Sequence, residues 1–354
     1  MPPKKKSRRN HRGSIDARRD PTWARLPDEK LLDLRFCDLG LQIEGTWLEE
    51  MIAKLYDELG QRGIRFRPHC WLSSEWFSPD GVPGIAMPFY LAHPRLMRLE
   101  RRRMLEVEGG TREWCLRILR HEAGHALDTA YHLRRKRRWQ QVFGRASQPY
   151  PDSYRPKPYS HDFVQHLGWW YAQSHPLEDF AETFAVWLRP GARWKRDYDG
   201  WSALSKLEYI DDLCRGVATA RPHVRTRQRV DPIGKLRRTL REHYDARHAR
   251  YGVDLSELYD RDLLRLFSPG GDPAGTSAVA FLRRVRPELR PLVSGWTEQH
   301  PYTVDQFLND MMTRCRALRL RLNRSEEQAK LDAAVLLTVQ VMYYVQTGGP
   351  RIAL

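Results

Sequence analysis

Hydrophobic residues in the first part of the chain recur with two different spacings. Between residues 47 and 59 apolar side chains return every three or four positions and glycines follow, which predicts an amphipathic helix. Alternating or short continuous apolar runs at 64–72 and 84–91 are typical of strands. Together with a short run at 33–36, these segments predict a small mixed sheet ahead of a longer helical region.

Helical spacing dominates the rest of the chain. A basic helix is predicted at 95–105, a long one at 112–133 and another at 174–188. Further amphipathic helices are predicted at 232–251, 255–267, 277–293 and 304–346. The predicted fold class is therefore α+β, with a small mixed sheet followed by a mostly helical C-terminal domain.

A Pro- and Arg-rich stretch at 221–230 predicts a boundary between two domains. We expect a basic disordered arm at 1–22, a first domain at 23–222 and a helical domain at 223–354. The 354 residues are 41% hydrophobic and include 12 Trp, so the chain is long and apolar enough to bury a sizeable core.

The charge balance points to acidic partners. Sixty Lys and Arg residues against 44 Asp and Glu leave a net charge of +16, which suits nucleic acid or an anionic membrane surface. The basic arm offers a non-specific contact for nucleic acid, but no pattern in it specifies a base or a groove. An equally simple interpretation is a basic enzyme with a solvated tail.

Cysteine spacing and the apolar stretches indicate a cytoplasmic protein. The five cysteines lie far apart and form no C-x-x-C pair, which argues against a disulfide framework and a zinc ribbon. No apolar segment follows the basic start, so no secretory signal is expected. The most apolar stretch, at 333–345, is shorter than the ~20 residues that a membrane span needs.

Candidate chemistry begins with the sequence H-E-A-G-H at residues 121–125. His121 and His125 are four residues apart and point the same way on a helix, so both imidazoles can bind one metal ion. Glu122 then lies beside the open metal position. About 0.03 accidental matches to H-E-x-x-H are expected in such a chain. Asp128 shares this helical face and is expected either to hold an imidazole or to be an exposed acid.

The helix predicted at 112–133 does not supply a third metal ligand. A metzincin would need Gly at 128 and His at 131, where this chain has Asp128 and Tyr131. In the later helix, Glu178 and Glu182 are four apart, so one can bind the metal and the other can hydrogen-bond a ligating histidine. Their spacing does not decide between these roles. Two surface acids, or His175 as a substitute ligand, remain the alternatives.

Two segments carry a resemblance to a known family. H-E-A-G-H-A-L-D at 121–128, followed by S-H-P-L-E-D-F-A-E-T at 174–183, resembles the zinc-binding metallopeptidase family of bacteria, the Mx-type peptidases. It is more distantly similar to the gluzincin domain of anthrax lethal factor. The resemblance implies a zincin-like fold, Glu178 as the third ligand and Glu182 as its outer support. It also implies that Tyr171 stabilises an oxyanion.

The resulting hypothesis is a zinc-dependent metallopeptidase that hydrolyses peptide bonds. One Zn²⁺ per chain would be bound by His121, His125 and Glu178, and Glu122 would act as general base toward a water activated by the metal. A peptide or protein substrate is expected along an edge strand at 84–91. The alternative is a basic nucleic-acid-associated or scaffold protein with a structural or vestigial zinc site, which would normally need four protein ligands.

Overall fold

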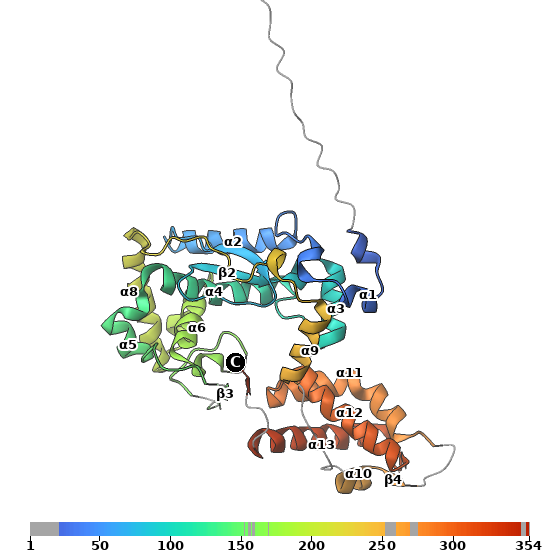
Figure 1. Ribbon diagram of the computed structural model, residues 1–354. Helices are drawn as coiled ribbons and strands as arrows, with labels where there is room; N and C mark the ends of the chain where they lie inside the picture. Colours follow the sequence, from blue (N-terminus) through green and yellow to red (C-terminus); the bar gives the residue numbers. More distant parts are fainter. Residues whose placement is uncertain are drawn as a thin grey trace, which may run out of the picture.

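The structure is a computed structural model of the chain. It describes residues 21–151, 153–154, 157, 160–168, 170–251, 260–269, 275–347 and 352–353. Most described elements are helices and the strands are short and few, so the predicted α+β class is confirmed at that level (Figure 1). None of the described helices has both the length and the apolarity that a bilayer span requires.

The bounds of the elements are as follows. The first part contains α1 (Asp28–Leu32), α2 (Trp47–Gln61), β1 (His69–Ser73), β2 (Gly84–Pro88), α3 (Pro94–Met104), α4 (Arg112–Tyr131), α5 (Arg137–Phe143), β3 (Ser153–Tyr154), α6 (Pro176–Leu188), α7 (Trp194–Asp197) and α8 (Ala203–Thr219). The second part contains α9 (Leu240–Tyr251), α10 (Asp260–Leu266), β4 (Ser268–Pro269), α11 (Ala278–Thr297), α12 (Pro301–Ala317), β5 (Leu320–Arg321), α13 (Glu326–Thr347) and β6 (Ile352–Ala353). Short 3₁₀ helices are η1 (Thr22–Arg25), η2 (Phe36–Leu39), η3 (Phe89–Ala92), η4 (Leu133–Arg135), η5 (Tyr171–Gln173) and η6 (Ile233–Lys235).

The sheet above α4 is smaller than its sequence pattern suggested. β1 and β2 are parallel, with His69 opposite Gly84 and Ser73 opposite Pro88. The predicted strand at 33–36 is wrong, because this segment makes only an isolated bridge at Arg35 and continues into η2. Its backbone is held by the chain that returns before α9, since the amide of Phe36 donates to the carbonyl of Arg238 at 3.2 Å.

Helix α4 lies at the centre of the first core and contacts α2, β2 and α6 (Figure 1). Thr111 caps its start, with the side chain accepting from the amide of Trp114. Gly124 allows α6 to approach closely, because a Cβ there would lie 2.9 Å from the Cα of Ala181. Helix α4 is therefore packed on three sides and lies especially close to α6.

Helix α6 begins with a histidine cap. The ring of His175 accepts a hydrogen bond from the amide of Leu177, and Pro176 occupies the first helical position. Nearly every residue of α6 is buried, including three acids: Glu178, Asp179 and Glu182. Buried carboxylates are costly unless paired, so each of these acids needs a partner.

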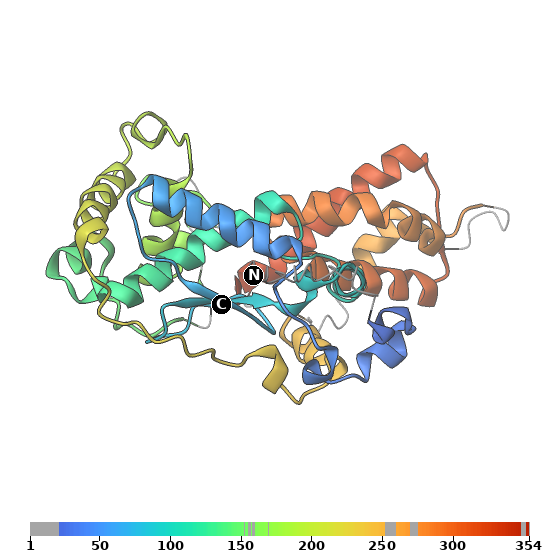
Figure 2. The ribbon, with the colours of Figure 1, turned by 90° about the horizontal axis from the view of Figure 1, so that it is seen from above.

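The C-terminal helices form a second hydrophobic cluster, built from α10 to α13. Figure 2 shows these orange to red helices lying to one side of α4 and α6. The predicted single helix at 304–346 is wrong: α12 and α13 are separated by β5, which pairs with β4. This pairing takes the backbone out of the helix at Arg319, where φ is +52°. The division into domains at residue 222 stays a prediction.

Candidate metal centre

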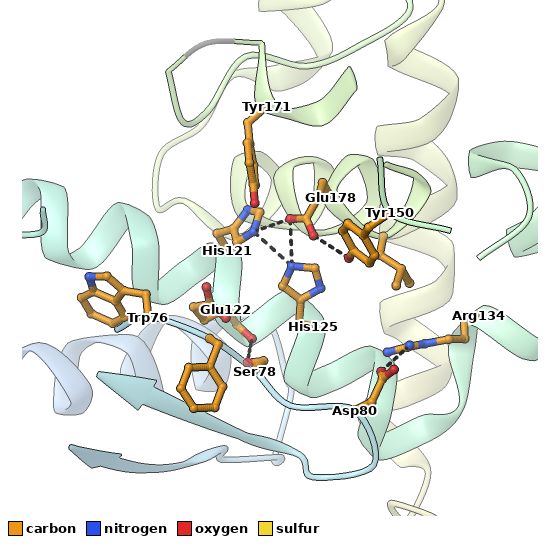
Figure 3. Close-up of a pocket in the computed structure, with 12 residues that line it drawn as sticks. Trp76, Ser78, Asp80, His121, Glu122, His125, Arg134, Tyr150, Tyr171 and Glu178 are labelled. Carbon is orange, nitrogen blue, oxygen red and sulfur yellow. Dashed lines mark hydrogen bonds and ion pairs between the residues drawn. The ribbon is translucent and has the colours of Figure 1, made fainter. Parts of the chain in front are cut away.

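Three donor atoms from α4 and α6 converge on one point (Figure 3). The Nε2 atoms of His121 and His125 are 3.1 Å apart. An Oε2 atom of Glu178 lies 3.0 Å from the first and 3.1 Å from the second. Zinc bonds of about 2.0–2.1 Å in a tetrahedron separate neighbouring donors by about 3.3 Å. The three residues therefore fit a zinc ion with little movement of their side chains.

A second carboxylate orients the first histidine. Glu182 Oε1 accepts from Nδ1 of His121 at 2.8 Å, and its Oε2 accepts from the amide of Leu167 at 2.8 Å. With its proton held at Nδ1, the imidazole presents the lone pair of Nε2 to the other donors. Sequence spacing left open which glutamate takes which position, and the structure brings Glu178 to the donor cluster and Glu182 behind it.

Electrostatics in this cluster favour a cation. Burial acts to lower the pKa of His121, but hydrogen bonds and negative charge from Glu178 and Glu182 outweigh it and raise that pKa. Burial acts to raise the pKa of Glu178, but the charge of His125 and the hydrogen bonds from both histidines hold it well below its usual range. An anionic carboxylate among imidazoles is the donor set that Zn²⁺ prefers.

Glu122 is buried beside the donors without a full set of partners. Its Oε2 atom has no hydrogen-bond partner within the described part of the chain. Burial raises the pKa of its carboxyl group. A buried acceptor with no partner is costly, so this oxygen requires a water or a substrate proton.

Two tyrosines approach the cluster from the loop that precedes α6. Tyr171, in η5, places its ring centroid 5.6 Å from that of His121, and burial followed by the charge of Glu178 raises its pKa. Tyr150 donates its hydroxyl to Oε1 of Glu178 at 2.7 Å and stacks on His175. Sequence reasoning missed Tyr150, whose only signal was its place in a tyrosine-rich loop.

Two expectations are corrected at this site. Asp128 holds no imidazole: it is fully buried and accepts from the backbone amide of Arg134 at 2.6 Å and from its guanidinium. His132 ends α4 in a left-handed conformation, which turns Arg134 back onto this acid. His175 is not a substitute ligand, because its Nδ1 caps α6 and its Nε2 contacts the carbonyl of Gln148 at 3.0 Å.

The donors lie at the base of a cleft of about 350 Å³. Trp76 and Ser78 lie on one side and the two tyrosines on the other, while Asp80 and Arg134 form an ion pair of 2.7 Å at one end (Figure 3). Phe77 also lines the cleft. The substrate edge predicted at 84–91 is wrong, because Phe77 and Ala86 exchange backbone hydrogen bonds on that side of β2. The segment at 76–78 lies between β2 and the cleft.

Comparison with known families agrees with this geometry. Residues 100–191 match the model of a family described as putative zinc-binding metallo-peptidase. This segment is similar to that family. The matched segment contains α4 and α6 and so all three donors and Glu122, which supports zinc as the metal and hydrolysis of peptides as the general activity. No curated protein and no solved structure matches the chain.

Proposed function

We propose that the chain is a zinc-dependent metallopeptidase with a zincin-like catalytic domain of the gluzincin type. One Zn²⁺ would be held by His121, His125 and Glu178. The observation that carries this proposal is the convergence of their donor atoms, 3.0–3.1 Å apart, at the base of a cleft. The family whose model matches residues 100–191 is described as zinc-binding, which supports the choice of metal.

Bound in this position, Zn²⁺ would activate a water and polarise the carbonyl of the scissile bond. Glu122 is the proposed general base, because it lines the cleft, one of its carboxylate oxygens has no hydrogen-bond partner among the described residues, and burial raises its pKa. A carboxylate of raised pKa takes a proton more readily than an ordinary one and then delivers it to the leaving amine. Glu182 keeps His121 in the tautomer that the site needs.

Tyr171 is the proposed donor to the oxyanion. It lines the cleft, and burial raises the pKa of its hydroxyl, which therefore keeps its proton and can donate. The substrate chain is proposed to lie along residues 76–78, where extended backbone borders the cleft and can hydrogen-bond a peptide.

The competing interpretation is a structural or vestigial zinc site in a basic nucleic-acid-associated or scaffold protein. A structural site is closed by four protein ligands, whereas the donor group found among the described residues has three and lines a cleft. The basic arm proposed to contact nucleic acid lies mostly outside the described residues. The cysteines are all free, which supports the proposed cytoplasmic location.

Metal content tests this proposal. Elemental mass spectrometry should find about one zinc per wild-type chain. Zinc should be lost in Glu178→Ala, weakened in Glu182→Ala and retained in Glu113→Ala, an exposed acid on α4 that serves as the matched control. A wild-type chain without zinc, or equal zinc in all three variants, would contradict the proposed site.

A further inference from the structure

Helix α13 is apolar on two faces, which a helix of a monomeric bundle does not require. Its inner face packs into the second cluster through residues spaced four apart: Ala329, Ala333, Leu337 and Val341. Its outer face carries a second row at the same spacing: Leu331, Val335, Val339 and Tyr343. The residues of this outer row are 50–60% exposed. A continuous exposed apolar row marks a surface that another molecule covers.

Helix α11 extends this surface. Glu288 pairs with Lys330 at 2.9 Å, and Arg284 pairs with Glu326 one turn earlier. From the first pair to the second, the residue number rises by four in α11 and by four in α13. The two helices therefore run side by side in the same direction. Continued by one and two turns along α11, this register would place Leu292 beside Ala334 and Trp296 beside Thr338, and both of these α13 positions adjoin the outer row in the helix.

Both α11 residues are exposed, Trp296 by 79%. Together with the outer row of α13 they form one apolar face, which we call the α11–α13 face. Tryptophan and tyrosine, here Trp296 and Tyr343, are among the residues that most often supply the binding energy of protein interfaces.

The distribution of charge favours a second copy of the chain over a membrane or nucleic acid. No Lys, Arg, Asp or Glu occurs in α13 after Asp332, although the chain as a whole carries +16. A helix that binds anionic lipid has cations beside its apolar row, and a surface that binds nucleic acid needs them. The part of this face beyond Asp332, which α13 leaves without charges, is where two strongly cationic copies can meet with least repulsion.

An evenly spaced row can also meet the same row of a second copy. With two copies antiparallel about position 337, Val335 of each copy lies opposite Val339 of the other, and Leu331 lies opposite Tyr343. Two-fold dimers use the same surface on both copies, so a residue on one copy meets its mirror position on the other. We propose that the α11–α13 face binds a second copy, with the two α13 helices antiparallel and Val335 of each copy against Val339 of the other.

Sedimentation of the full chain tests the interface. The wild type should be a dimer at micromolar concentration, and the double variant Val335→Glu with Val339→Glu should be a monomer with an unchanged circular dichroism spectrum. Leu264→Glu, which alters an exposed leucine of α10, is the matched control and should stay dimeric. A wild type that is monomeric up to ~100 μM would overturn the proposal, and so would a dimeric double variant.

A vesicle experiment separates the membrane alternative. Vesicles of phosphatidylcholine and phosphatidylserine are sedimented with each protein. The fraction of wild-type chain found with the vesicles should be no larger than the fraction of the double variant. Binding that is lost in the double variant, from a wild type that is monomeric in solution, would assign the α11–α13 face to lipid and overturn the proposal.

Disulfide trapping tests the antiparallel register. A mixture of Val335→Cys and Val339→Cys chains, oxidised with tetrathionate, should form more cross-linked dimer than either variant alone. The wild type, whose half-buried Cys37 and Cys70 stay in place, measures the background. Cross-linking that is strongest within Val335→Cys alone would contradict the symmetry about position 337.

Discussion

Helices α6 and α13 each reverse the usual distribution of side chains, in opposite senses. In α6 three acids are buried, whereas in α13 a row of apolar residues is exposed. Each arrangement costs free energy in an isolated monomer, through desolvated charge in the first case and hydrated apolar surface in the second. Both helices therefore need something else: α6 a cation and polar partners, and α13 a protein surface. Departures from the usual distribution of side chains therefore mark both proposed sites.

The largest effect is expected from a substitution in the proposed metal centre. In Glu122→Gln the proposed base can no longer take a proton, so kcat for peptide hydrolysis should fall by roughly 10²–10⁴-fold. Zinc content should stay at the wild-type level, because Glu122 is not one of the donors. Glu113→Gln on the exposed side of α4 is the control. Hydrolysis at the wild-type rate by Glu122→Gln would rule out this mechanism.

The next effect concerns the buried ion pair at the end of α4. Asp128→Asn leaves the guanidinium of Arg134 without its buried charge partner and should lower the free energy of unfolding by about 3–5 kcal/mol. Asp80→Asn removes the other acidic partner of the same guanidinium. The side chain of Asp80 is 86% exposed. This control should cost at most ~1 kcal/mol. Urea denaturation measures both, and equal losses would show that burial does not decide the effect.

Two substitutions on α13 compare its buried face with its exposed face. Leu337→Ala empties a buried position and should cost about 2–5 kcal/mol. Val335→Ala, on the outer face of the same helix, should change the stability of the monomer by less than ~0.5 kcal/mol. Both are measured by urea denaturation in dilute protein. A large loss for Val335→Ala under these conditions would mean that its side chain packs within one copy.

The smallest expected effect lies at the tyrosine that sequence reasoning missed. Tyr150→Phe removes the hydrogen bond to Glu178 but keeps the ring that stacks on His175, so zinc affinity should fall by roughly ten-fold. Competition with a zinc-binding dye measures this change. Tyr56→Phe, which removes a hydrogen bond from a tyrosine of α2 to the carbonyl of Pro68, should leave the affinity unchanged, because Tyr56 does not line the cleft. Equal affinities in wild type and Tyr150→Phe would remove Tyr150 from the site.

Local periodicity accounts for what could be predicted. The two histidines of α4 and the two glutamates of α6 are each one helical turn apart, so a sequence spacing was enough to group them. Tyr150 could not be found this way, because it reaches Glu178 from an irregular loop 28 residues away. The break between α12 and α13 was missed for a similar reason. It depends on the pairing of β5 with β4, a tertiary contact that overrides helical spacing.

The distance along the chain between the donors has a thermodynamic consequence. His125 and Glu178 are 53 residues apart and come together only when α4 and α6 are packed. An ion that binds the folded chain but not the unfolded chain raises the free energy of unfolding by RT ln(1 + [L]/Kd), where [L] is the free metal concentration and Kd its dissociation constant. This is about 2.7 kcal/mol when free metal is 100 times Kd. The melting temperature of this protein would then depend on the free zinc concentration of its buffer. The same chain would be measurably less stable in a chelating buffer than in one with buffered zinc.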